Sequence, residues 1–204
     1  INKISFFFLI LFLFSTSLIS LKILKNVNTH DIKISGSEFF SQNDLVKNSS
    51  LNFPTRLIFI KTNLLEKELK QNLSLKNVSV SRQILPFGLK VHIKTRTPIA
   101  YGEKILNNKK ISGFIDKDGI FISQKNLEKK SFKKFTIQVF GWKEKFKKTL
   151  SEIFLAQENY ELGILKIMFS PNGFLTIEEE DLNQILLGFD SNLINYQLQI
   201  ISNL

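Results

Sequence analysis

The residues able to do acid–base, nucleophilic or metal chemistry are few in this chain. Its 204 residues include two histidines and no cysteine, which excludes disulfide bonds and thiolate chemistry. The sequence has no glycine-rich loop of the kind that cradles phosphate groups, and no nucleophile has a candidate base near it in sequence. We therefore predict that the protein is not an enzyme and has no catalytic residue, no cofactor and no metal ligand.

Two acidic segments and one histidine are the strongest candidates for metal ligands. Asp116-Lys117-Asp118-Gly119 begins like a calcium loop, but the fifth and twelfth loop positions are Ile120 and Leu127, which cannot be ligands. We interpret this segment as a hairpin turn. Residues 178–181 are all acidic, but adjacent carboxylates cannot converge from one strand, so we expect a solvated turn. His92 falls on the polar face of a predicted strand, which favours a solvent-facing role.

The lysine content raises the question of nucleic-acid binding, because basic surfaces displace counterions from phosphates. The formal net charge is +10, but the lysines are spread along the chain. The densest segment, Lys125 to Lys148, has nine lysines and no arginine, and it lacks an aromatic sheet motif or a zinc ligand set. We therefore expect no nucleic-acid partner and interpret the segment as a solvated face or a contact with anionic lipid headgroups.

The segment from Ile4 to Leu21 predicts membrane attachment. Thirteen of its eighteen residues are Ile, Leu or Phe, and none is charged. As a helix of about 27 Å, extended through Leu24, it would match a bilayer core of about 30 Å. We therefore expect residues 1–25 to form a single transmembrane helix.

A cleaved signal peptide is the alternative for this segment, with Phe6–Phe14 as its apolar part and Ser15–Ser17 as the cleavage zone. The lack of an Ala-x-Ala site and the return of apolar residues from Leu18 onward favour an uncleaved anchor. Because the chain begins with Ile, we expect its true N-terminus to be missing, so flanking charges cannot orient the anchor.

Residues 29–98 show the pattern of an α+β domain. Polar–apolar alternation predicts strands, and leucines at i, i+4 and i+8 predict a helix with one buried face. Ser41 and Thr62 can each cap a helix, and residues 85–88 predict a turn. The expected elements are a strand at 31–35, helices after Ser41 and Thr62, and hairpin strands at 78–81 and 89–94. This order predicts a three-stranded sheet with two helices on one face.

Residues 99–204 predict a second, mixed α/β domain. Short apolar runs bounded by turn residues indicate strands, and an amphipathic stretch indicates a helix. The expected strands are 111–115, 120–122, 164–169, 174–177 and 185–188, and the expected helices are 142–160 and 193–204.

Several residues, taken together and in order, resemble a known family. They are Ile34-Ser35-Gly36, Leu73 through Val78, Val80, Arg82, Pro86, Leu89–Ile93 and Arg96-Thr97-Pro98-Ile99-Ala100. In this combination they resemble a POTRA domain and the junction that follows it in the FtsQ/DivIB family of bacterial cell-division proteins. The structural signature is Gly36, Arg82, Pro86, Arg96, Pro98 and Ala100. Thr95 departs from the family, which usually has an acidic residue there.

The resemblance implies a non-enzymatic divisome scaffold that acts during septum formation. It implies a single-pass protein of the bacterial cytoplasmic membrane, with its N-terminus in the cytoplasm and both domains outside. The implied partners are division proteins of the FtsB and FtsL type, other division proteins that contact the POTRA domain, and membrane lipid. The alternative is a POTRA-containing component that transports or chaperones polypeptides in outer-membrane assembly. Such proteins usually repeat the POTRA unit before a barrel, and neither pattern is visible in this sequence.

The family resemblance also suggests where a partner binds. In the family a final strand follows the last helix, and the edge of that strand receives the partner. The chain ends at Leu204, so we expect the domain at 99–204 to be incomplete at its C-terminal end. We predict partner contacts from the residues at and after the last expected strand, which are Ile185, Leu186, Leu187, Gly188, Leu193, Tyr196 and Ile200.

Overall fold

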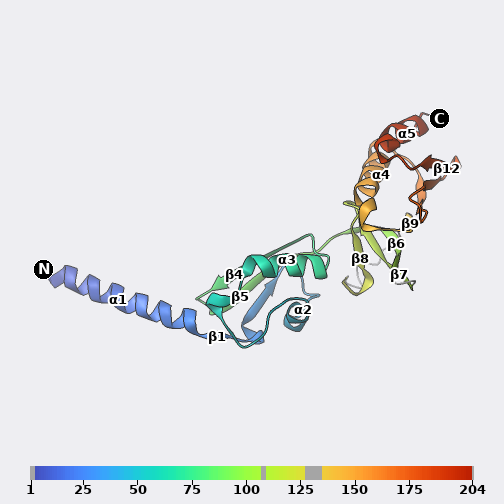
Figure 1. Cartoon of the computed structure of the whole chain (residues 1–204). Coiled ribbons are helices and arrows are strands. Elements are labelled where there is room, and N and C mark those ends of the chain that lie inside the picture. Colours follow the sequence, from blue (N-terminus) through green and yellow to red (C-terminus); the bar gives the residue numbers. More distant parts are fainter. Residues whose placement is uncertain (1–2, 107–108, 127–134, 204) are drawn as a thin grey trace. The chain divides into compact units, whose positions relative to one another are not determined.

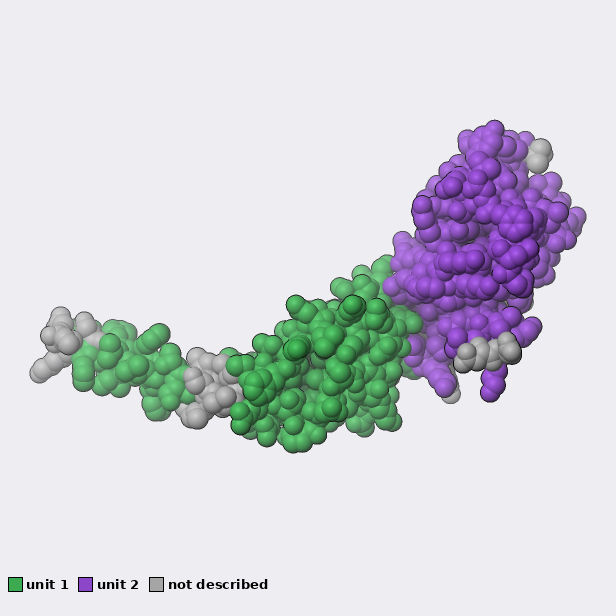
Figure 2. Space-filling model, in the orientation of Figure 1, with its two compact units in different colours: residues 1–95 green, residues 96–204 purple. Residues whose placement is uncertain are grey.

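The computed structural model describes residues 3–106, 109–126 and 135–203 (Figure 1). The chain divides into two compact units, residues 1–95 and residues 96–204, shown in green and purple in Figure 2. Both units combine helices with β-sheet in their described residues, as the α+β class requires.

Unit 1 is built on a three-stranded, POTRA-like sheet in the order β2-β5-β4. β2 runs parallel to β5, and β4 runs antiparallel to β5. The elements are α1 (Lys3–Leu24), β1 (Asn26–Val27), η1 (Thr29–Asp31), β2 (Ile32–Ser35), α2 (Gln42–Lys47), β3 (Thr55–Arg56), η2 (Leu57–Phe59), α3 (Thr62–Asn72), β4 (Asn77–Gln83) and β5 (Gly88–Lys94). The short strands β1 and β3 pair antiparallel in a separate ribbon that the sequence pattern does not predict.

The core of unit 1 contains one face of α3 and one face of the sheet. Leu65, Leu69 and Leu73 are spaced four residues apart, which places them on one side of the helix, and all three are buried. They belong to the same apolar cluster as Val80 and Val91, whose strands alternate buried and exposed positions. The predicted leucine stripe is therefore the packing face of α3.

The two helices of unit 1 begin differently. Ser41 caps α2, since its Oγ accepts the N–H of Asp44 while Oδ2 of Asp44 accepts the N–H of Ser41. Thr62, by contrast, is the first residue inside α3, and Lys61 before it makes no side-chain cap. The predicted cap at Ser41 is confirmed, and the one at Thr62 is wrong.

The N-terminal segment forms the helix α1, but the prediction of a transmembrane helix is wrong. Among the described residues, none of the helices combines the length and the apolar character needed to cross a membrane. The uninterrupted apolar run is Phe6–Phe14, nine residues or about 14 Å of helix, against a bilayer core of about 30 Å. Hydroxyl residues follow, and Ser15 and Thr16 donate to the carbonyls of Phe12 and Leu13. Counting apolar residues over a wider window overstated the continuity of the segment.

Unit 2 contains a seven-stranded sheet in the order β12-β11-β10-β9-β6-β7-β8. Its elements are β6 (Pro98–Leu106), β7 (Lys109–Asp116), β8 (Phe121–Ser123), η3 (Gln124–Asn126), β9 (Gln138–Phe140), η5 (Glu144–Phe146), α4 (Lys147–Tyr160), β10 (Ile164–Phe169), β11 (Leu175–Glu179), β12 (Asn183–Gly188), η6 (Ser191–Leu193) and α5 (Ile194–Ile201). β10 has the bounds predicted from sequence, whereas β6 and β9 were not predicted. Residues 127–134 of the lysine-rich segment lie outside the described residues.

The short strand β9 joins two antiparallel halves of this sheet. β6, β7 and β8 form one antiparallel set, and β10, β11 and β12 form the other. β9 runs parallel to β6 on one side and to β10 on the other. The core includes Leu150 and Ile153 of α4 together with Val139 of β9 and Ile167 of β10, all fully buried. α4 therefore shares its core with both sets of strands.

Candidate partner-binding site

The predicted partner-binding residues lie on β12 and on the segment that follows it, at one edge of the unit 2 sheet. In the part of the chain that the structure describes, β12 pairs with β11 alone. The register between these strands runs from Glu179 opposite Asn183 to Leu175 opposite Gly188, so β12 is held along its whole length. The backbone N–H and C=O groups on the outer side of such an edge can pair with an additional strand.

Exposed apolar side chains surround this edge. Leu186, on β12, is 66% exposed, and Tyr196, on α5, is 64% exposed. A surface of this kind marks an interaction site when several large apolar residues lie together. The large apolar residues exposed at β12 and in the segment up to α5 are Leu186, Phe189, Leu193, Tyr196 and Ile200.

The other predicted residues attach β12 to the core. Leu187 is buried, and Ile185 is half-buried against the same apolar cluster. Gln197 of α5 donates from Nε2 to the carbonyl of Leu187 at 3.2 Å, while Oε1 of the same amide is buried without a hydrogen-bond partner. Gln197 thus fixes α5 to β12.

A cleft of about 230 Å³ opens where β12 ends. Its lining includes Phe146, Phe169 and Phe189, and the first two rings stack with centroids 4.2 Å apart. Gly188 also lines it, with a φ of +89° and no atom within 4 Å of the position a Cβ would take. The cleft is therefore open at the backbone of β12 and has an aromatic wall, which suits an apolar side chain of a partner.

The signature residues of unit 1 hold its turns. Gly36 has a φ of +87°, and a Cβ there would lie 2.2 Å from the carbonyl oxygen of Ile93, so a glycine is required. Arg82 donates through Nε and Nη2 to the carbonyl of Ile60, at 3.2 and 2.6 Å. Pro86 lies in the turn between β4 and β5. These positions shape unit 1 itself.

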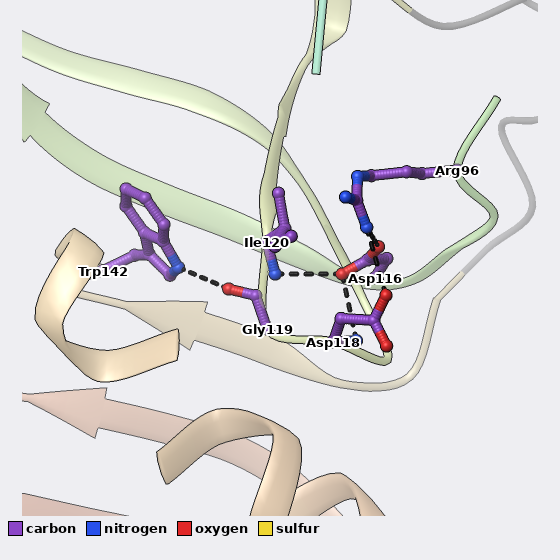
Figure 3. A network of polar contacts seen from close by, with 6 residues as sticks. All are labelled: Arg96, Asp116, Asp118, Gly119, Ile120 and Trp142. Atoms are coloured by element: carbon purple, nitrogen blue, oxygen red, sulfur yellow. Dashed lines mark hydrogen bonds and ion pairs between the residues drawn. The ribbon is translucent and has the colours of Figure 1, made fainter. Parts of the chain in front are cut away.

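Arg96 begins unit 2 and organises the turn between β7 and β8 (Figure 3). Its Nη1 lies 2.5 Å from Oδ2 of Asp116 and 3.1 Å from Oδ2 of Asp118. Oδ1 of Asp116 accepts the N–H groups of Asp118 and Ile120, at 3.0 and 2.9 Å. The Asp-x-Asp-Gly segment is thus a hairpin turn, as predicted, and its first carboxylate is held by an arginine.

The same turn is fixed from its other side by Trp142. The indole Nε1 donates to the carbonyl of Gly119 at 2.9 Å, and the bond is buried (Figure 3). Gly119 has a φ of +71°. Pro98 is the first residue of β6, and Ala100, two positions on, is fully buried. The signature residues of the junction therefore lie beside the β7–β8 turn, where Pro98 pairs with Asp116 and Arg96 binds its carboxylate.

The acidic run contains one buried carboxylate, so the prediction of a solvated turn is wrong for Glu179. This side chain accepts the N–H groups of Gly163, Asp181 and Leu182, at 3.2, 2.8 and 2.9 Å. These bonds, led by the one from Leu182, hold the pKa of Glu179 below its usual value, although burial opposes the shift. Glu179 therefore fixes the β11–β12 turn and with it the start of the edge strand.

A comparison with protein families decides the identity of unit 1. Residues 27–96 match the family model described as POTRA domain, FtsQ-type. This segment of the chain is an FtsQ-type POTRA domain. The match runs from β1 to Arg96 and confirms the resemblance to the FtsQ/DivIB family. No curated protein matches the chain significantly.

The family of this domain indicates a general role for the protein. The FtsQ-type domain supports a scaffold role in cell division, in a family that is non-enzymatic. It also suggests protein–protein interactions in division and a protein associated with the membrane.

Sequence reasoning missed two residues of the candidate site, Phe189 and Gln197. Phe189 is 64% exposed, and its ring meets Phe174 edge-on at 5.0 Å between centroids. A large aromatic residue directly after a strand-ending glycine was the available signal. Gln197 carried no such signal, because its bond to Leu187 depends on how α5 packs on β12.

Proposed function

We propose that this protein is a non-enzymatic scaffold of the bacterial divisome that binds a partner at the β12 edge of unit 2. The proposed partners are membrane division proteins of the FtsB and FtsL type, through which the scaffold would be linked to septum formation. The predicted domains, 29–98 and 99–204, would divide the work, with unit 2 binding this partner and the POTRA unit contacting other division proteins.

The exposed edge of β12 carries this proposal. Backbone groups on its outer side give affinity to an added strand, and side chains beside it give selectivity. Leu186 and Tyr196 offer apolar contact area next to the edge, and the cleft at Gly188 offers a pocket for one anchoring side chain. The FtsQ-type POTRA domain, whose family is non-enzymatic, supports a scaffold role over an enzymatic one.

Hydrogen exchange with and without an FtsB-type partner segment tests the mode of binding. An added strand should protect the amides on the outer side of β12, because each would donate to the partner backbone. Protection confined to unit 1, or a complex that forms with unchanged exchange along β12, would refute the proposed edge.

Two substitutions test the side-chain contacts. We expect Leu186→Lys and Tyr196→Ala each to weaken the complex about tenfold or more, because both remove exposed apolar contact area from the proposed surface. Leu155→Lys is the matched control, since Leu155 is 58% exposed on α4. Equal effects from all three would mean that the edge has no special role.

We also propose that both units act on the outer side of the cytoplasmic membrane, as the family resemblance implies. A protease added to intact spheroplasts should then cut the chain, whereas a protein on the inner side of the membrane would be cut only after the spheroplasts are lysed. A chain that is protected from the protease in intact spheroplasts would contradict this location. The mode of partner binding is tested separately, by hydrogen exchange.

A further inference from the structure

Three segments of unit 1 converge beside the end of α1. The β1–β3 ribbon places η2, which directly follows Arg56, against this end of the helix. Lys25 Nζ lies 5.3 Å from the ring centroid of Phe87, in the turn between β4 and β5. Arg82, near that turn, donates to the carbonyl of Ile60 at 2.6 Å. The last residues of α1 are therefore flanked by η2 and by the β4–β5 turn.

The tips of these segments carry large apolar side chains that face solvent. Phe59 is 67% exposed and Leu85 is 77% exposed, and Ile58 beside them is 47% exposed. Such side chains at turn tips contribute nothing to the core of unit 1. The apolar side chains of residues 6–14 in α1 are also at least half exposed.

Positive charge surrounds the same tips. The exposed cations are Lys25, Arg56, Lys61 and Arg82. The carboxylate of this region, Asp31, is only partly exposed and accepts the N–H of Asn28 at 2.8 Å, so it is already engaged. Apolar tips among cations are the surface pattern of a protein segment that lies at an anionic membrane interface.

We infer that unit 1 seats this apolar–basic rim, Ile58, Phe59 and Leu85 with Lys25, Arg56, Lys61 and Arg82, on the surface of an anionic lipid bilayer. The apolar tips enter the headgroup region, and the cations pair with lipid phosphates. A bilayer is favoured over a protein partner because the tips project from two turns, whereas a protein would need a matching hollow. The inference is independent of the proposed partner site, which lies in unit 2.

The absence of cysteine allows a label to be placed at a single position of the whole chain. We would attach an environment-sensitive fluorophore to Phe59→Cys and to Leu85→Cys, and add vesicles of phosphatidylcholine with or without phosphatidylglycerol. With the anionic lipid, both labels should shift to shorter emission wavelength and brighten. Lys25→Gln and Lys61→Gln should each raise the lipid concentration needed for half of this response about fivefold, as expected for the loss of one surface cation.

Labels at two exposed positions away from the rim are the matched controls, Lys70→Cys on α3 and Leu155→Cys on α4. They should keep the emission of a label in water while the rim labels respond, which separates seating of the rim from attachment through α1. Rim labels that behave like the controls would overturn the lipid assignment and favour a protein occupant. An equal response to neutral vesicles would overturn the role of the cations.

Discussion

Arg96 and Asp116 form a buried ion pair, with Nη1 and Oδ2 2.5 Å apart and side chains only 8% and 4% exposed. The pair joins the first residue of unit 2 to the end of β7, and the second oxygen of Asp116 holds the turn that follows. An unpaired charge at such a buried site destabilises the folded state far more than an exposed charge does, because it has lost its hydration. The pair therefore makes the start of unit 2 depend on the β7–β8 turn.

We expect Arg96→Ala to lower the free energy of unfolding of unit 2 by about 3–5 kcal/mol, because Asp116 would stay buried without its partner. The sole tryptophan, Trp142, lies in unit 2 and hydrogen-bonds to the same turn, so its fluorescence reports this unfolding in denaturant. Lys148→Ala is the control, since its pair with Glu152 involves a lysine that is 86% exposed and should contribute less than about 1 kcal/mol. A loss no larger than that of the control would contradict the role of the pair.

Gly119→Ala should destabilise unit 2 because of both backbone conformation and space. The residue has a φ of +71°, and an added Cβ would lie 2.2 Å from the carbonyl oxygen of Lys147. Gly173→Ala is the matched control. Gly173 also has a positive φ, +100°, but the nearest atom to an added Cβ is Lys145 Nζ at 4.0 Å. This substitution therefore has the conformational cost of about 1–2 kcal/mol without a steric clash. We expect Gly119→Ala to exceed this control clearly in a denaturant titration. Similar losses would mean that the turn can move away from Lys147.

Glu179 should make the stability of unit 2 depend on pH. Because backbone N–H groups lower its folded pKa, its contribution is present above the unfolded pKa of about 4.3 and is lost as the pH falls through the folded value. Glu179→Gln should therefore reduce stability most near neutral pH, and the difference from the parent chain should shrink on acidification. Denaturant titrations from neutral to acidic pH measure this difference, with Glu158→Gln on the exposed part of α4 as the control. A difference that grew toward low pH would have the wrong sign.

Glu66 protects the outer edge of the POTRA sheet. Its Oε1 accepts the N–H of Val80 at 2.7 Å, and β4 is the edge strand. Glu66→Ala should cost about 1–3 kcal/mol and leave this edge N–H free to pair with another chain. Sedimentation at rising protein concentration should then show self-association that the parent chain and the exposed-site control Lys67→Ala do not show. A monomer at all concentrations would mean that Glu66 stabilises the unit without protecting its edge.

The elements that the sequence predicts well carry their own periodic pattern. The leucines of α3 repeat at helical spacing, and β10 is a continuous apolar run between turn residues. The strand predicted at 185–188 likewise follows from a short apolar run that ends at Gly188, and it forms most of β12. In each case the signal lies within the element, so neighbours along the chain are sufficient to predict it.

The elements that the sequence misses depend on distant partners. β9 has three residues and is defined by parallel pairing with β6 and β10, which no local pattern encodes. β6 includes Pro98 and Gly102, and because both residue types are uncommon inside strands, the sequence did not predict a strand there. Glu179 looks like part of a solvated acidic run, and only the folded turn brings three N–H groups to its carboxylate. At α1 the sequence predicted a feature that the structure lacks. The high number of apolar residues in the segment suggested a membrane-spanning helix, although the uninterrupted apolar run is short.

The parallel strand β9 has a mechanical consequence for a load applied at the β12 edge of the sheet. A pull on β12 passes through β11 and β10 before it reaches β9, and β9 meets β6 at only two register positions, Tyr101 with Gln138 and Gly102 with Val139. Two further backbone bonds reinforce this seam, from Tyr101 N–H to the carbonyl of Ile137 and from Trp142 N–H to that of Glu103. Under load the sheet is expected to part here, so the half that contains β12 would separate from β6 before its own strands separate from one another.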